Sequence, residues 1–220
     1  MKEIKIELIK ELKKEQRERI IKRHHHSIWM HGKSPQALYW ENSEVQQLRF
    51  DVLLGCGVSE GDSVLDVGCG FADLYRHMQN NGIDVDYTGL DLSPDMIDKA
   101  KEITPTLKLV QGDLFDFDPP EQGYDWVLLS GALNEPLQDE GRYLSVMIPR
   151  LYACCKKGLA FNLLNADHNW PARDLYMLQP YKPGEVLAQL NALSPYVTHR
   201  TDYMEVDASY FIWRDKKYRP

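Results

Sequence analysis

The chain has 220 residues, 27% charged and 43% hydrophobic, a balance that supports a packed core and argues against disorder. No run approaches the ~20 apolar residues of a membrane span, and the first residues lack a secretory signal's apolar core. We therefore expect a cytoplasmic protein with no membrane partner. Its four cysteines, Cys56, Cys69, Cys154 and Cys155, are too few and too oddly spaced for a disulfide framework or a paired zinc site.

Charge is divided unevenly along the sequence. Residues 1–23 hold nine basic and five acidic residues, a net charge of +4, whereas the remaining chain holds 17 basic and 28 acidic residues, a net charge of −11. Because phosphate binding depends on Lys and Arg, the acidic body argues against a nucleic-acid substrate. The basic arm leaves docking to a macromolecule open as an alternative.

Apolar residues recur every four positions at Ile4, Leu8 and Leu12, which predicts an N-terminal helix with a thin apolar stripe. Such a helix is either a solvated arm or a segment that binds a partner or acts as a lid. In this interpretation residues 1–58 form an N-terminal arm and lid. The histidines 24–26 cannot all face one ion on a regular helix. No cysteine or carboxylate stands at ligand spacing beside them, so we expect no metal site.

Strands and helices alternate from residue 59 to the end of the sequence. Asn42 or Ser43 caps an earlier helix whose apolar face comprises Val45, Leu48, Val52 and Leu53. The expected strands are 64–67, 85–91, 107–110, 126–129 and 159–164. The expected helices begin near residues 72 and 94 and cover 139–152 and 183–190, with Pro149 bending or shortening the third.

The C-terminal residues 196–202 and 208–213 alternate in the manner of a β-hairpin. The alternation before them predicts a parallel sheet covered on both faces. The expected fold is therefore α/β: a Rossmann-like, seven-stranded, mostly parallel sheet with helices on both faces and an antiparallel C-terminal hairpin.

A glycine turn and an acidic residue follow the first two expected strands. Gly68 and Gly70 let the backbone approach a ligand closely, and Asp91 can accept hydrogen bonds from both ribose hydroxyls. A dinucleotide fingerprint requires a third glycine at position 73, where this chain has Asp73. Asp66 would also repel a pyrophosphate. A cationic nucleoside without phosphate, S-adenosylmethionine (SAM), suits these acids better.

Four motifs in this stretch resemble those of class I SAM-dependent methyltransferases, in the same order. They are Val64–Gly70, Tyr87–Met96, Gln111–Leu114 and Tyr124–Gly131, and the resemblance spans roughly residues 60–165. A stretch with His31, Gly32, Trp40, Gln46, Arg49 and Phe50 also resembles a bacterial subgroup of the family. The resemblance implies that residues 59–220 form a SAM-binding methyltransferase domain.

The resemblance also assigns roles to individual residues. Gly68, Cys69 and Gly70 would lie against the methionine part of SAM, with Asp66 near its amino group and Ser130 beneath its tail. Asp91 would hold the ribose, while adenine would contact Leu92, Met96, Asp113 and Leu114. Arg49, assisted by Gln46, would pair with the SAM carboxylate. Several of these residues also have structural explanations: Asp113 as a turn cap, Met96 as core, and Cys69 as a small turn residue.

The sequence predicts the acceptor only by class. Methyl transfer requires alignment of donor and acceptor, and a hydroxyl or amine acceptor must also lose a proton. Candidates for a base or an acceptor contact are His31, His168, Tyr39, Asn134 and Glu135, with Trp40 as a wall of the pocket. A small-molecule acceptor methylated on oxygen or nitrogen is favoured. The alternatives are an RNA or protein methyltransferase, a non-catalytic SAM-binding scaffold and, last, a nicotinamide dehydrogenase.

Overall fold

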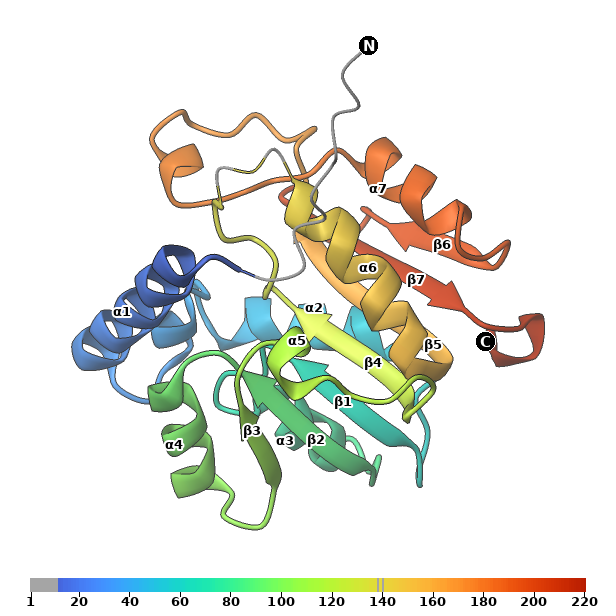
Figure 1. The fold of residues 1–220 in the computed structure, drawn as a ribbon, viewed down its shortest axis with the longest axis horizontal. Coiled ribbons are helices and arrows are strands. Elements are labelled where there is room, and N and C mark those ends of the chain that lie inside the picture. The colour runs from blue at the N-terminus through green and yellow to red at the C-terminus, as the bar shows by residue number, and fades with distance from the viewer. Residues whose placement is uncertain (1–11, 138, 140) are drawn as a thin grey trace, which may run out of the picture.

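A computed structural model describes residues 12–137, 139 and 141–220, and its centre is a single sheet of seven strands (Figure 1). The strands lie in the order β3-β2-β1-β4-β5-β7-β6. Their bounds are Ser63–Val67 (β1), Asp86–Asp91 (β2), Lys108–Gln111 (β3), Tyr124–Ser130 (β4), Cys155–Leu164 (β5), Val197–Arg200 (β6) and Asp207–Trp213 (β7). Strands β1 to β5 pair in parallel, and β7 is antiparallel to both β5 and β6. The predicted fold class is confirmed.

Helices cover both faces of the sheet because alternate strand residues point to opposite sides. On one face, Trp126 and Leu128 of β4 pack with α2 (Ser43–Leu54), α3 (Asp73–Asn80) and α4 (Pro94–Ile103). On the other, Val127 and Leu129 pack with α6 (Arg142–Cys154) and α7 (Pro183–Asn191). Shorter helices are α5 (Leu114–Phe117) and the 3-10 turns η1 (Pro35–Leu38), η2 (Asp174–Tyr176) and η3 (Lys216–Tyr218).

The N-terminal helix α1 covers Lys14–His31 and lies beside the ends of the strands (Figure 1). It continues through the three histidines, where the sequence analysis placed no element. The expected stripe residues Ile4 and Leu8 lie outside the described residues. Leu12 and Ile20 are buried in the main core cluster, so the segment between them is anchored on the fold.

Pro149 does not end α6, and the apolar face predicted for α2 was wrong at one residue. Pro149 lies inside α6, which is continuous from Arg142 to Cys154. The buried packing of Leu144, Ile148 and Leu151 on this helix explains its tolerance of a proline that removes one backbone donor. In α2, Leu48 is exposed while Gln46 and Arg49 are buried. The cap on α2 is confirmed: the amide of Val45 donates to Oδ1 of Asn42 at 2.8 Å.

No helix within the described part of the chain is long and apolar enough to cross a membrane.

Candidate active site

One cavity of about 470 Å³ lies at the carboxyl edge of the sheet, within the size range of small-ligand sites. Residues following β1, β2, β3 and β4 line one part of it, and the end of β5 and the segment before β7 line the other. Leu12, Ile20, Arg23 and His24 cover it from the N-terminal side. In open α/β sheets, ligands bind at this edge, where strand order reverses. That reversal occurs here between β1 and β4.

The turn after β1 places glycine at two positions with positive φ, where a Cβ would meet close neighbours. Gly68 has φ +78°, and a Cβ there would lie 2.3 Å from Cβ of Ala132. Gly70 has φ +54°, and its Cβ would lie 2.8 Å from Cδ2 of Leu38. The Gly68 amide donates to the carbonyl of Leu90 at 2.7 Å, which fixes the turn against the end of β2. The result is a bare stretch of backbone facing the cavity.

Two buried carboxyl groups flank this turn. Asp91 accepts hydrogen bonds from the amides of Gly70 and Ser93, both at 2.9 Å. Burial raises the pKa of Asp91, whereas the nearby His24 and those two amides oppose the shift. Asp66 accepts a hydrogen bond from the hydroxyl of Tyr87 at 2.6 Å. Burial raises the pKa of Asp66 to about 7, against the effect of the Tyr87 hydrogen bond. This part of the cavity suits a cation.

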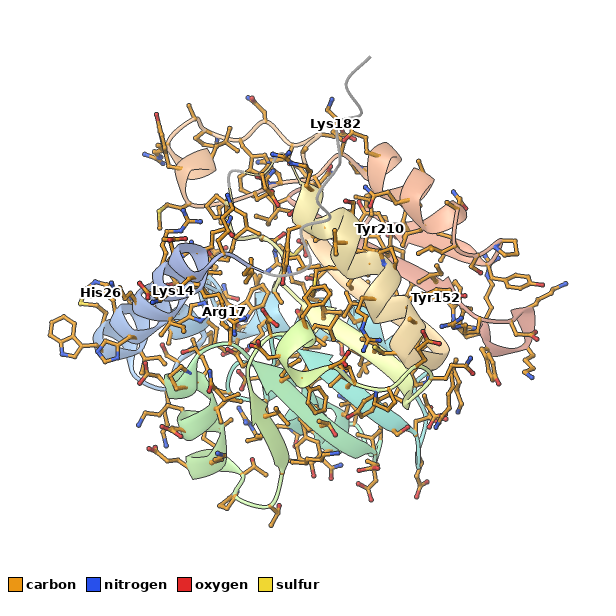
Figure 2. All side chains as sticks on the ribbon, in the orientation of Figure 1. Lys14, Arg17, His26, Tyr152, Lys182 and Tyr210 are labelled. Atoms are coloured by element: carbon orange, nitrogen blue, oxygen red, sulfur yellow. The ribbon has the colours of Figure 1, made fainter. Side chains whose placement is uncertain are left out.

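On the β3 side, Asp113 has two sets of partners. Its Oδ1 accepts from the amides of Phe115 and Asp116, both at 2.9 Å, so Asp113 caps α5. Its Oδ2 accepts from Arg17 of α1 at 2.8 Å, and Figure 2 shows Arg17 on the side of α1 that faces the sheet. Leu92, Met96 and Leu114 add apolar surface to this end of the cavity.

At the end of β4, Ser130 and Gly131 lie beside Trp40. The side-chain amide of Asn162 donates to Oγ of Ser130 at 3.3 Å, and its Oδ1 accepts from the Gly131 amide at 2.8 Å. A Cβ at Gly131 would lie 2.8 Å from Cη2 of Trp40, so the indole packs against bare backbone. The loop after β4 is therefore fixed from both sides, by β5 and by the N-terminal region.

Arg49 and Gln46 project from α2 to the cavity lining. Nε of Arg49 donates to Oδ2 of Asp207 at the start of β7, and the guanidinium carbon lies 4.5 Å from the centre of the Trp40 ring. The terminal nitrogens of Arg49 make no hydrogen bond to the described residues. Gln46 donates to Oδ2 of Asp73 at 3.1 Å. Buried arginine and glutamine on one helix face indicate a polar site, not a core.

The opposite end of the cavity is apolar. Its side chains come from β5, the loop after it and the β6–β7 connection, and they are Leu164, Trp170, Leu178, Met204 and Val206. Asn134 accepts from the Leu164 amide at 3.0 Å and braces this end. Glu135 forms an ion pair with Arg23 at 2.8 Å, and the Tyr39 hydroxyl donates to the Arg23 carbonyl at 2.9 Å. Tyr39, Asn134 and Glu135 all line the cavity, as does Trp40.

The two residues predicted as catalytic, His31 and His168, do not line the cavity. His31 is the last residue of α1 and is exposed. The ring of His168 packs edge-on against Trp170, 5.1 Å between centroids, and it is Trp170 that lines the cavity. Neighbouring positions in an irregular loop face different ways, so sequence proximity to β5 was a poor guide to the site.

Sequence reasoning missed Arg23 and His24 as cavity residues. The three histidines diverge: His24 lines the cavity, His25 lies 3.0 Å from Asp95, and His26 stacks on Trp29. Figure 2 shows His26 on the outer side of α1. Among the described residues, no three His, Cys, Asp or Glu side chains are grouped to hold a metal ion. Extending the predicted N-terminal helix through residue 31 would have placed the three histidines on different faces, and only this signal could have distinguished His24 from its neighbours.

Comparisons with known proteins agree on one class. Residues 64–158 match the family described as the methyltransferase domain. A putative methyltransferase of Mycobacterium tuberculosis is 27% identical over 127 residues, which cover 54% of this chain and 74% of that protein. The fatty-acid O-methyltransferase of Mycolicibacterium smegmatis is 37% identical over 71 residues, covering 31% of this chain and 26% of that enzyme.

A solved structure extends the likeness to most of the fold. Magnesium protoporphyrin IX methyltransferase from Synechocystis PCC 6803 with bound SAM has a TM-score of 0.57 and 19% identity, with 77% of this chain and 80% of that chain covered. The chain spans 52% or less of the length of three curated relatives. With the matched motifs and the cavity, these findings identify residues 64–158 as a methyltransferase domain and support a class I SAM-dependent methyltransferase. The protein is thus an enzyme of the methyltransferase class, and its cofactor is S-adenosylmethionine.

Proposed function

We propose that this enzyme transfers a methyl group from SAM to an oxygen or nitrogen atom of a small acceptor with a largely apolar body. The observation that carries the proposal is the division of one cavity into an acidic half at β1–β2 and an apolar half at β5–β7. The two halves meet at Gly68 and Ser130, so a donor in the first half and an acceptor in the second would approach each other there.

The residues of the acidic half fit SAM. SAM carries a sulfonium and an amino group and lacks phosphate. Gly68 and Gly70 line the cavity without side chains, packed closely against Ala132 and Leu38. The proposed contacts are Asp91 with the ribose, Asp66 near the amino group, Leu92, Met96, Asp113 and Leu114 around adenine, Ser130 beneath the methionine tail, and Arg49 with Gln46 at the carboxylate.

Cys69 contributes backbone only in this proposal. Its thiol is buried, and burial raises the pKa of the thiol well above its ordinary value. A protonated thiol is a poor nucleophile. This favours a turn residue beneath the methionine part over covalent catalysis.

SAM, when bound, supplies an activated methyl group, so alignment and water exclusion are the main tasks of the protein. Trp40 and Trp170 form apolar walls, and Asn134 holds the β4 loop to β5, which fixes the acceptor half relative to Ser130. Helix α1 covers the opening. The fatty-acid O-methyltransferase related to this chain has, by its name, an apolar acceptor, which is consistent with the apolar lining.

The basic arm also has a role in this proposal. Arg17 pairs with Asp113 and Asp116, and Arg23 with Glu135. These arginines already form ion pairs with acidic residues at the rim of the cavity. The pairs favour a lid role for residues 12–31 over docking to RNA or protein.

The test combines binding with acceptor screening. S-adenosylhomocysteine should bind in calorimetry, and radiolabel from methyl-labelled SAM should enter apolar carboxylic acids, phenols or amines in a panel that also contains RNA and protein. Trp170→Ala should weaken turnover of the best acceptor while leaving S-adenosylhomocysteine affinity unchanged. Trp29→Ala, at a position 74% exposed on α1, is the matched control. Label found only in RNA or protein would overturn the small-acceptor proposal.

A further inference from the structure

His24 is the one histidine of the triplet that faces the cavity. It follows Arg23 on α1, and its side chain is only 19% exposed. It lines the same cavity as Asp91, although 67 positions separate the two in the sequence. The charge of His24 acts on Asp91 and opposes the effect of burial on the pKa of that carboxyl. The next residue of α1, His25, lies 3.0 Å from Asp95 in the first turn of α4, directly after β2, so this part of α1 lies near the end of β2.

The hydrogen bonds of His24 are incomplete. Its Nε2 lies 3.9 Å from Oε1 of Glu135, whose Oε2 accepts from Arg23 at 2.8 Å. Its Nδ1 is buried and has no hydrogen-bond partner among the described residues. Buried polar atoms in native proteins almost always have a partner, and one without a partner beside a cavity points to a ligand. The imidazole thus has one side turned to Glu135 and one side unmatched.

The backbone that carries His24 is held firmly. The hydroxyl of Tyr39 donates to the carbonyl of Arg23 at 2.9 Å, and the Tyr39 ring lies 6.0 Å from the imidazole, centroid to centroid. On the same helix, Arg17 is tied to Asp113 at 2.8 Å. Because Arg17 and Arg23 anchor α1 before His24 and His25 contacts Asp95 directly after it, the unmatched nitrogen has a defined position over the cavity.

We infer that His24 is a cofactor-binding residue carried by the lid: its Nδ1 hydrogen-bonds a ribose hydroxyl of SAM opposite Asp91. The inference rests on the proposed function, because it assigns Asp91 to the ribose. Each carboxylate oxygen of Asp91 has one backbone donor and keeps a further lone pair for a hydroxyl. A hydroxyl both donates and accepts, so it can bond Asp91 and the imidazole together.

The order of the strands separates this role from an acceptor role. The apolar lining comes from β5 and the segment before β7, and β1 and β4 lie between β5 and β2 in the sheet. His24 lines the same cavity as Asp91 at the end of β2, and its neighbour His25 contacts Asp95 just after that strand. In this inference α1 covers the nucleoside part of SAM, and His24 is the one residue of the histidine triplet that contacts it.

The experiment measures ligand affinity by calorimetry for the full chain and four variants. S-adenosylhomocysteine and 5′-methylthioadenosine serve as ligands, since they share the nucleoside and only the first has the amino-acid tail. His24→Ala should weaken both about tenfold, by a similar factor, as expected for loss of one buried hydrogen bond. His24→Asn, which keeps a polar atom near the place of Nδ1, should recover most of the affinity. His24→Gln, which places it near Nε2, should not, and exposed His26→Ala should match the unchanged chain.

Three results would overturn the assignment. They are unchanged affinities in His24→Ala, a loss confined to S-adenosylhomocysteine, and rescue by Gln instead of Asn. A thermal melt of each unliganded variant separates these results from misfolding, and His24→Asn keeps the test open if His24→Ala does not fold. Failure of the unchanged chain to bind either ligand would instead contradict the proposed function itself.

Discussion

Nη1 of Arg17 lies 2.8 Å from Oδ2 of Asp113 and so joins the N-terminal helix to the turn after β3, 96 positions away. The same guanidinium also pairs with Asp116, and this contact lowers the pKa of the Asp116 carboxyl. Oδ1 of Asp113 is already taken by two backbone amides. A nucleoside that reaches Asp113 must therefore share it with Arg17, which couples the position of α1 to occupation of the cavity.

Replacing Arg17 tests this coupling. Arg17→Ala should make the 12–31 segment more sensitive to limited proteolysis, because the helix loses its link to the β3 turn. Arg17 is partly exposed, so the free energy of unfolding should change by only about 1 kcal/mol. Lys14→Ala is the control, since Lys14 is exposed and pairs only loosely with Glu18 at 3.9 Å. Equal cleavage rates in both variants would show that Arg17 does not hold the helix.

Asp91 provides the most direct test of the ribose assignment. Asp91→Ala should weaken S-adenosylhomocysteine binding by ~1–3 kcal/mol through lost charged hydrogen bonds. It also frees the amides of Gly70 and Ser93, so calorimetry should be accompanied by a thermal melt. Asp86→Ala, at the exposed far end of the same strand, should leave the affinity unaltered. Unchanged binding in Asp91→Ala would remove this residue from the proposed site.

The sheet and the cofactor site at its carboxyl edge could be predicted from the sequence because they depend on local sequence signals. A short apolar run ending in Gly68 or Asp91 specifies both a buried strand and what stands at its carboxyl end. The acceptor end of the cavity was harder to predict from the sequence. It is assembled from Trp170, Met204 and Val206, which meet only through the pairing of β5 with β7. No local pattern in the sequence encodes that meeting of side chains.

Asp66 gives a pH dependence whose sign can be worked out. Its pKa is about 7 in the folded chain, above the ordinary value of 3.8, because burial disfavours the ionised form. The folded state then binds more protons than the unfolded state between these values, so the contribution of Asp66 is lost as pH rises toward about 7. Relative to Asp66→Asn, the unchanged chain should lose about 1–3 kcal/mol of stability between about pH 5 and about pH 7.5.

Urea denaturation at the two pH values makes this comparison, and Asp125 supplies its control. The amide and hydroxyl of Ser63 donate to Asp125 and lower the pKa of its carboxyl despite partial burial. Asp125 is therefore ionised throughout this pH range in both the folded and the unfolded chain. Asp125→Asn should change the free energy of unfolding by the same amount at both pH values. A constant difference between Asp66→Asn and the unchanged chain would contradict the raised pKa of Asp66.

Gly68 tests whether the bare turn is required for binding or only for its backbone shape. An alanine there meets two penalties: a left-handed φ of +78° and a Cβ 2.3 Å from that of Ala132. Gly82 has a similar φ of +73° but nothing within 4 Å of its Cβ position. Gly82→Ala thus measures the backbone strain alone, about 1–2 kcal/mol of stability, with S-adenosylhomocysteine affinity retained. Gly68→Ala should cost more stability in urea denaturation and also abolish binding in calorimetry, because Ala132 and the β4 loop must move. Equal losses in the two variants would mean that the turn needs glycine for its backbone conformation and not for the close approach to β4.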